Sequence, residues 1–222
     1  LRGGLLVDPG AGLPSAVPEA DAVASLLEGA GVEVREVRAS PGWRLELVRA
    51  LSSSQLFHYA GHGSFDYSEE RGSFYSRLVL SGAGGQTLDY RDVLSAGVRP
   101  RLVAYLNACE SGLLSDRPGA MDLYGLVPNL LASGFSSVLA PALPVSDDLA
   151  RAQAVRFYRV LSEGGAAGEA FLESRRSVLA ALESGALEPP WRSRVPPGQR
   201  RILNMVDAWS TLLYGGVSGR IR

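Results

Sequence analysis

Two side chains in this sequence could perform nucleophilic catalysis, the thiol of Cys109 and the imidazole of His62. Cys109 is the only cysteine and follows an apolar run at 102–107, whereas His62 lies between two glycines just after the apolar run 55–60. The thiolate form of cysteine is a strong nucleophile, and a nearby imidazole can remove the thiol proton during attack. The pair therefore predicts a cysteine protease that acts through a thioester intermediate.

The positions of these residues along the chain explain how they could meet. Each follows a strand-like segment, and the carboxyl ends of neighbouring parallel strands lie at the same edge of a sheet. Backbone N–H groups just after such strand ends can also donate hydrogen bonds to the oxyanion of a tetrahedral intermediate. Gly63 and Cys109 are the candidate donors.

Other interpretations of the same residues are open. A single cysteine in an apolar segment is commonly an inert core residue, although the polar, turn-forming flank 107–112 favours an exposed position for Cys109. His58 lies inside an apolar run, which predicts a hydrogen-bonded core histidine. His58 and His62 are four residues apart, and this spacing places two metal ligands on one face of a helix but not of a strand. We therefore expect no metal site.

The composition narrows the possible classes of protein. The chain has 222 residues, of which 46% are apolar and 20% charged, so it can bury a substantial core. The net charge of −1, from 22 basic and 23 acidic residues, gives no basis for nucleic acid or an anionic membrane as a partner. A single cysteine cannot form an internal disulfide, which fits a reducing, cytoplasmic location.

The spacing of apolar residues predicts alternating strands and helices. Strand-like runs lie at 4–8, 32–37, 55–60, 102–107, 137–143 and 208–214. Helix-like runs begin near Pro18, Trp43, Asp89, Asp122, Asp147 and Ala167. The polar stretch 64–85 predicts a surface hairpin or flap, and 188–201 predicts a loop. This alternation indicates an α/β fold with a mostly parallel sheet of about six strands.

The motifs around the two candidate residues resemble those of a known family. His58–Gly63 (HYAGHG) and Leu106–Gly112 (LNACESG) are similar to the CHAT domain, a caspase-like peptidase module related to caspases and separases. Similarity at 5–9, 18–20, 136–139 and 157–161 extends the resemblance over nearly the whole chain. It implies a caspase-like α/β/α sandwich, with His62 as catalytic base, Cys109 as nucleophile, the amides of Gly63 and Cys109 as oxyanion hole, and no cofactor.

The sequence departs from the family pattern at positions that affect substrate choice. Asn107 is neutral, whereas caspases have glutamine and metacaspases aspartate at this place, and Leu143 replaces a tryptophan that is common in the family. Asp147 and Asp148 could form an acidic S1 pocket for a basic P1 side chain. A helix N-cap explains Asp147 equally well.

We therefore expect one domain, residues 1–222, that works as a cysteine endopeptidase on a protein or peptide substrate. Leu1 replaces an initiator methionine, and CHAT-like domains commonly follow helical repeats in bacterial proteins, so a regulatory repeat domain is an expected partner. The alternative is an inactive caspase-like scaffold that binds partners. A small-molecule hydrolase with the same dyad is a third interpretation, disfavoured by the long polar loop after His62.

Overall fold

A computed structural model describes residues 1–8, 12–38, 42–68, 73–80, 86–109, 111–113, 125–189 and 192–221. Its main feature is a six-stranded sheet in the order β2 (Glu33–Arg38), β1 (Arg2–Val7), β3 (Leu56–Ala60), β7 (Arg101–Asn107), β8 (Phe135–Pro141) and β9 (Thr211–Gly215). The first five strands are parallel, and β9 runs antiparallel to β8. The predicted mostly parallel sheet of about six strands is confirmed.

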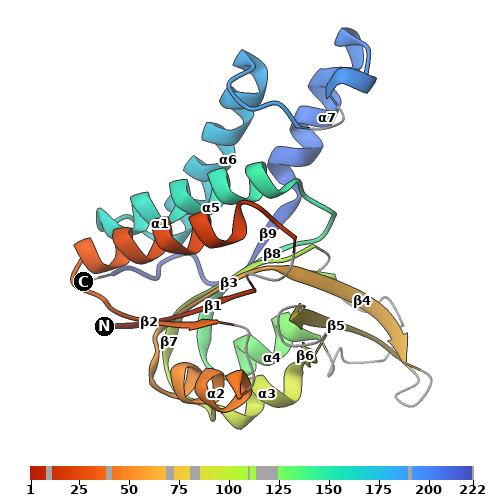
Figure 1. Ribbon diagram of the computed structural model, residues 1–222. Helices are drawn as coiled ribbons and strands as arrows, with labels where there is room; N and C mark the ends of the chain where they lie inside the picture. Colours follow the sequence, from red (N-terminus) through yellow and green to blue (C-terminus); the bar gives the residue numbers. More distant parts are fainter. Residues whose placement is uncertain are drawn as a thin grey trace.

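Helices cover both faces of this sheet, as Figure 1 shows. One layer contains α1 (Ala16–Gly29), α5 (Asp147–Ser162) and α6 (Ala167–Ser184), and the other contains α2 (Trp43–Ser53), α3 (Tyr90–Ser95) and α4 (Leu126–Ala132). The first three residues of the helix predicted from Asp122 lie outside the described residues. The arrangement is the expected α/β/α sandwich.

The two layers follow from the period of a strand, since successive side chains point to opposite faces. Leu6 and Phe57 pack with α2 residues such as Trp43 in one buried cluster, whereas Leu5 packs with α1 residues such as Val23 in the other. All five residues of β3 are buried. Strands covered on both faces have continuous apolar sequences, which is why these segments were recognisable.

The last part of the chain differs from the sequence-based expectation. The predicted loop 188–201 contains a 3₁₀ turn, Arg192–Arg194, and the start of α7 (Pro197–Trp209), which packs against α6. The final strand begins at Thr211 rather than at residue 208. Residues 208 and 209 of the predicted strand end α7, whose exposed apolar residues 202, 205, 206 and 209 have helical spacing, whereas residues 211–214 form the predicted strand.

A second, antiparallel sheet lies at the carboxyl edge of the main sheet. It consists of β4 (His62–Ser68), β5 (Ser73–Leu80) and β6 (Gln86–Leu88), and Figure 1 shows the β4–β5 hairpin extending from the body. The predicted hairpin is confirmed, but it begins at His62. Only Gly61 separates β3 from β4, so the candidate base is held between two strands.

The amino end of β7 is anchored by a buried arginine. The guanidinium of Arg101 donates hydrogen bonds to the backbone oxygens of Leu51, Ala96, Gly97 and Ser133. These oxygens lie at the carboxyl ends of α2, α3 and α4, where the helix dipoles are negative. Arg101 therefore ties one whole helical layer to the strand that precedes Cys109.

No described helix is long and apolar enough to cross a membrane.

Candidate active site

The carboxyl ends of β3 and β7 bring the two sequence-predicted residues together. The parallel register pairs Ala60 with Asn107, and the Gly61 N–H continues the pairing with a 3.2 Å hydrogen bond to the Asn107 carbonyl. His62 and Cys109 each lie two residues beyond this last pair. Both line one cleft of about 80 Å³ at the edge of the sheet.

The backbones that carry the two residues are in direct contact. An ideal Cβ placed on Gly63 would lie 2.4 Å from the carbonyl oxygen of Cys109 and 3.0 Å from the Cβ of Ala108. The first distance is far shorter than any real contact of this kind, and the obstructing atom belongs to the backbone. Glycine is therefore needed at position 63 for space, and its absence of a side chain lets the His62 segment approach Cys109.

The turn that presents Cys109 is held on its far side. Ser111 donates two hydrogen bonds to the Ala108 carbonyl, from its N–H at 3.3 Å and from its hydroxyl at 2.8 Å. The Gly112 N–H donates to Pro141, and the Tyr214 hydroxyl donates to the Gly112 carbonyl at 2.6 Å. These bonds connect the turn to β8 and β9, so the position of Cys109 is determined by three strands.

The thiol of Cys109 has a resting partner across the cleft. It is part-buried and donates a weak hydrogen bond to the Val145 carbonyl, with 3.8 Å between sulfur and oxygen. Among the hydrogen bonds of the described residues, none uses the backbone N–H of Cys109. The site therefore combines a thiol that contacts Val145 with an unused backbone donor on the same residue.

The backbone of His62 is fixed by a buried phenol. The Tyr59 hydroxyl lies 3.0 Å from the carbonyl oxygens of both His62 and Val79, and its ring covers Gly61, where an added Cβ would lie 2.3 Å from the hydroxyl oxygen. Burial raises the pKa of Tyr59 well above its ordinary value, and the charge of Asp8 raises it further. The phenol therefore keeps the proton that it donates to the histidine segment.

A buried carboxylate lies beneath the cleft. Glu19 of α1 is 1% exposed, and its two oxygens accept hydrogen bonds of 2.8 and 2.7 Å from the Asn107 amide. His58 Nε2 lies 2.9 Å from Glu19 Oε1, although the ring N–H does not point along this line. An unpaired buried carboxylate would be costly, so these contacts join α1, β3 and β7 at one point.

The surroundings of Glu19 are aromatic. The rings of Tyr105 and Tyr158 lie 5.5 and 5.3 Å from the ring of His58. Burial raises the pKa of both phenols well above the ordinary value, and the nearby Glu19 raises it further, so both stay neutral. His58 is a buried core histidine, as its apolar run predicts, but the predicted hydrogen bond is not found, since neither ring nitrogen has a hydrogen-bond partner among the described residues. The ring contacts Glu19 rather than lining the cleft.

The residues predicted to bind substrate lie in different places. Asn107 is 7% exposed and its amide is committed to Glu19, while Asp147 lines the cleft beside Cys109. Asp148 lies on the other side of the first turn of α5, in a separate groove. The Asp147 carboxylate accepts from the Ser15 N–H at 2.6 Å, and that of Asp148 accepts from the Ser15 hydroxyl at 2.7 Å.

Two expectations about individual residues change. Asp147 was expected to be able to cap α5, but the extended residue before the helix is Ser146, and Asp147 is the first helical residue. No site role is predicted for Glu19 from the sequence, yet its carboxylate accepts hydrogen bonds from Asn107 at the end of β7. Its apolar helical neighbours, which place it on the buried face of α1, were the available signal. Nothing local predicted the role of the Val145 carbonyl.

Comparisons with known proteins give a matching family and two solved structures of similar fold. The family model described as the CHAT domain matches residues 7–192. The crystal structure of the Arg specific cysteine proteinase gingipain R (RgpB) aligns with a TM-score of 0.61 and 13% identity, over 100% of this chain and 47% of that chain. The complex of Porphyromonas gingivalis RgpB pro- and mature domains gives 0.60 and 14%, over 100% and 48%. The chain thus spans about half the length of those proteins. No curated protein sequence matches it.

The close approach at Gly63 predicts a specific sensitivity. Gly63→Ala should lower the free energy of unfolding by about 2 kcal/mol, because the added methyl group collides with the backbone of Cys109. The same change should remove most peptide cleavage. Gly29→Ala is the matched control, since a Cβ at Gly29 meets nothing within 4 Å. Thermal melting and cleavage of a mixed peptide library measure both effects. Equal behaviour of the two variants would contradict the proposed contact.

The Glu19 contacts predict that a second change can repair a first. Glu19→Gln should cost about 2 kcal/mol of stability and lower activity, because a donor then faces the Asn107 amide. In the double variant Glu19→Gln/Asn107→Asp the amide and carboxylate exchange places, and we expect recovery of more than half of both losses. Chemical denaturation and the kcat for peptide cleavage report the two quantities. Additive losses in the double variant would show that Glu19 and Asn107 do not act as a pair.

Proposed function

This chain belongs to the CHAT domain family, and from that premise we propose that it is a cysteine endopeptidase with Cys109 as nucleophile and His62 as base. The observation that supports the proposal is the shared cleft, which both residues line at the carboxyl edge of the parallel sheet. The caspase-like fold of the two solved structures agrees with peptidase chemistry. No metal or organic cofactor takes part in this mechanism.

The reaction begins with proton transfer from the Cys109 thiol to His62. The sulfur then attacks the peptide carbonyl carbon, and the negative charge develops on the carbonyl oxygen, where the N–H groups of Cys109 and Gly63 would donate hydrogen bonds. When the C–N bond breaks, His62 returns the proton to the leaving amine. A water molecule, deprotonated by His62, next hydrolyses the thioester and restores the thiol.

Substrate binding requires the cleft to widen. Its volume of about 80 Å³ is well below the roughly 300–1,000 Å³ of typical ligand pockets. One wall is the segment before α5, in which Leu143 and Pro144 are exposed. The Val145 carbonyl in this segment accepts the weak hydrogen bond from the Cys109 thiol. We infer that an incoming peptide displaces this segment, which releases the thiol from Val145 and leaves His62 as its acceptor.

A basic P1 side chain fits the charge of the cleft best. Asp147 is the carboxylate that lines the cleft beside the nucleophile, apart from the buried Glu19 that Asn107 and His58 already contact. Gingipain R, whose fold this chain shares, is described as Arg specific. We therefore propose cleavage after arginine or lysine, with Asp147 as the P1 contact.

The catalytic assignment predicts the outcome of labelling and substitution. A peptidyl halomethylketone should modify the folded protein once, because Cys109 is the only cysteine. Cys109→Ala should abolish both labelling and cleavage with little change in melting temperature, and His62→Ala should slow both by at least 100-fold. Intact mass and peptide-library cleavage measure these effects. Labelling of the unfolded chain alone would instead favour the inactive, partner-binding scaffold.

The specificity assignment predicts a difference between two adjacent carboxylates. Asp147→Asn should lower kcat/KM for peptides with basic P1 residues about tenfold, equivalent to about 1.4 kcal/mol. Asp148→Asn is the matched control, because Asp148 also binds Ser15 but lies outside the cleft. Mass-spectrometric profiling of cleavage sites gives both the preference and its loss. The same effect from both variants would contradict a direct P1 contact.

A further inference from the structure

A larger groove lies immediately beside the catalytic cleft. Its volume is about 700 Å³, within the range of ligand sites, and its floor is the outer side of α5 from Ser146 to Arg159. The segment 186–189 forms the opposite wall. Asp147 lines the cleft and Asp148 lines the groove, so only the first turn of α5 separates the two.

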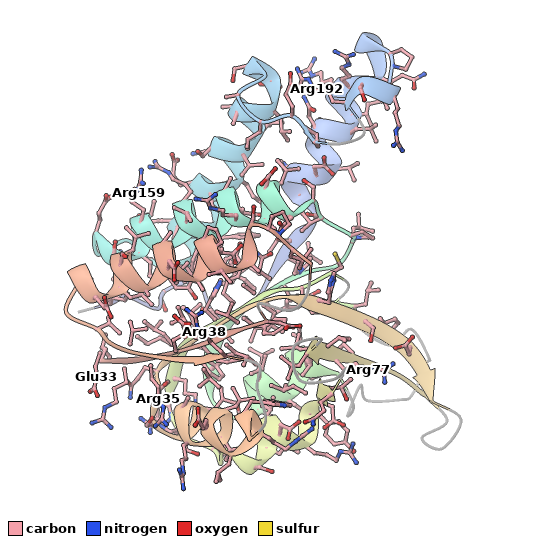
Figure 2. All side chains as sticks on the ribbon, in the orientation of Figure 1. Glu33, Arg35, Arg38, Arg77, Arg159 and Arg192 are labelled. Atoms are coloured by element: carbon pink, nitrogen blue, oxygen red, sulfur yellow. The ribbon has the colours of Figure 1, made fainter. Side chains whose placement is uncertain are left out.

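The groove has an excess of positive charge along α5. It is lined by Arg151, Arg156 and Arg159, and Figure 2 shows Arg159 projecting outward from this helical layer. Arg156 is paired with Glu173 at 2.8 Å, whereas among the described residues no ion pair involves Arg151 or Arg159. The lining contains two acids. Asp148 accepts a hydrogen bond from the Ser15 hydroxyl, and Glu188 lies on the opposite wall.

The lining also contains apolar surface and unsatisfied polar atoms. Ala152 and Val155 lie between the arginines along the helix, and the largely buried Leu149 precedes them. Ser146 Oγ and Arg156 Nε are buried and have no hydrogen-bond partner within the described residues. Both atoms lie below the groove surface, so the donors that a ligand would meet are the exposed guanidinium groups of Arg151 and Arg159.

The spacing of the charges selects an extended ligand. Arg151 and Arg159 are eight residues apart on α5, which corresponds to about 12 Å along the helix axis. This axial separation favours a ligand longer than a single carboxylate or phosphate. The distance from Asp148 to Arg159 is about 16 Å along the axis, the length of about five residues of extended chain.

We propose that this groove is an exosite for the protein substrate, which binds an acidic segment about five residues long on one side of the scissile bond. Substrate carboxylates pair with Arg151 and Arg159, and the apolar side chains between them pack on Ala152 and Val155. The polypeptide passes over the first turn of α5 from the groove into the cleft. This inference rests on the proposed peptidase function and adds a substrate class to it.

Binding is tested first, without catalysis. A fluorescein-labelled 12-residue peptide with alternating Glu and Val should bind the Cys109→Ala protein, and Arg151→Glu/Arg159→Glu should weaken binding at least tenfold in fluorescence anisotropy. Arg49→Glu, an exposed arginine of α2 on the opposite layer, should have no effect. Equal binding by all three proteins, or complete displacement by millimolar inorganic phosphate, would overturn the proposal of a peptide site.

Kinetics then test the connection with the cleft. Two peptides share one cleavage site, and one of them carries an acidic extension. The extension should lower KM about tenfold with kcat unchanged, and Arg151→Glu/Arg159→Glu should remove this advantage while cleavage of the short peptide stays the same. Cleavage that ignores the extension would overturn the exosite alone. If neither peptide is cleaved but the acidic peptide still binds in the groove, the endopeptidase function is wrong and the groove is a docking site for acidic partners.

Discussion

The structure depends on the buried carboxylate of Glu19. It comes from the first turn of α1, and it must be compensated by groups from two other elements because a lone charge cannot be buried at acceptable cost. Asn107 supplies two hydrogen bonds and His58 a close imidazole, so the ends of β3 and β7 are fixed relative to α1. Arg101 anchors the other end of β7. The strand that leads to Cys109 is thus held by buried polar groups at both ends.

The same region combines rigid and adjustable parts. Gly63 lets the histidine segment touch the Cys109 backbone, and Tyr59 holds the His62 carbonyl with a phenol that stays protonated. The opposite wall is anchored at its two ends, where the Ala142 N–H donates to the Ser210 carbonyl and Asp147 accepts from Ser15. Between these points Leu143 and Pro144 are exposed, and Val145 contributes one weak bond to the thiol. In the proposed mechanism, this contrast gives a fixed histidine segment and a wall that an incoming peptide displaces. The first turn of α5 then links the cleft to the neighbouring groove.

Much of this could be predicted from the sequence, and the exceptions have physical reasons. Buried parallel strands such as β3 have continuous apolar sequences, and the polar flanks of Cys109 and the glycines around His62 mark strand ends. The pairing of Glu19 with Asn107 depends on contacts between residues far apart in the chain, which no local pattern encodes. The contact between the thiol and the Val145 carbonyl could not be predicted, because every residue has a backbone carbonyl and no side-chain pattern marks this one. The start of α7 was predicted as a loop because the apolar residues of this helix at 202, 205, 206 and 209 face outward and do not form the buried stripe that marks a helix in a sequence.

The central claim is that Cys109 and His62 act on one substrate carbonyl in the shared cleft. An experimental structure of the protein treated with an arginyl chloromethyl ketone tests it most directly. The account predicts a covalent bond from the Cys109 sulfur to the inhibitor, the inhibitor oxygen facing the Cys109 N–H, its guanidinium near Asp147, and the Val145 carbonyl moved away from the sulfur. An unmodified sulfur still bound to Val145, or an adduct with His62 turned out of the cleft, would contradict it.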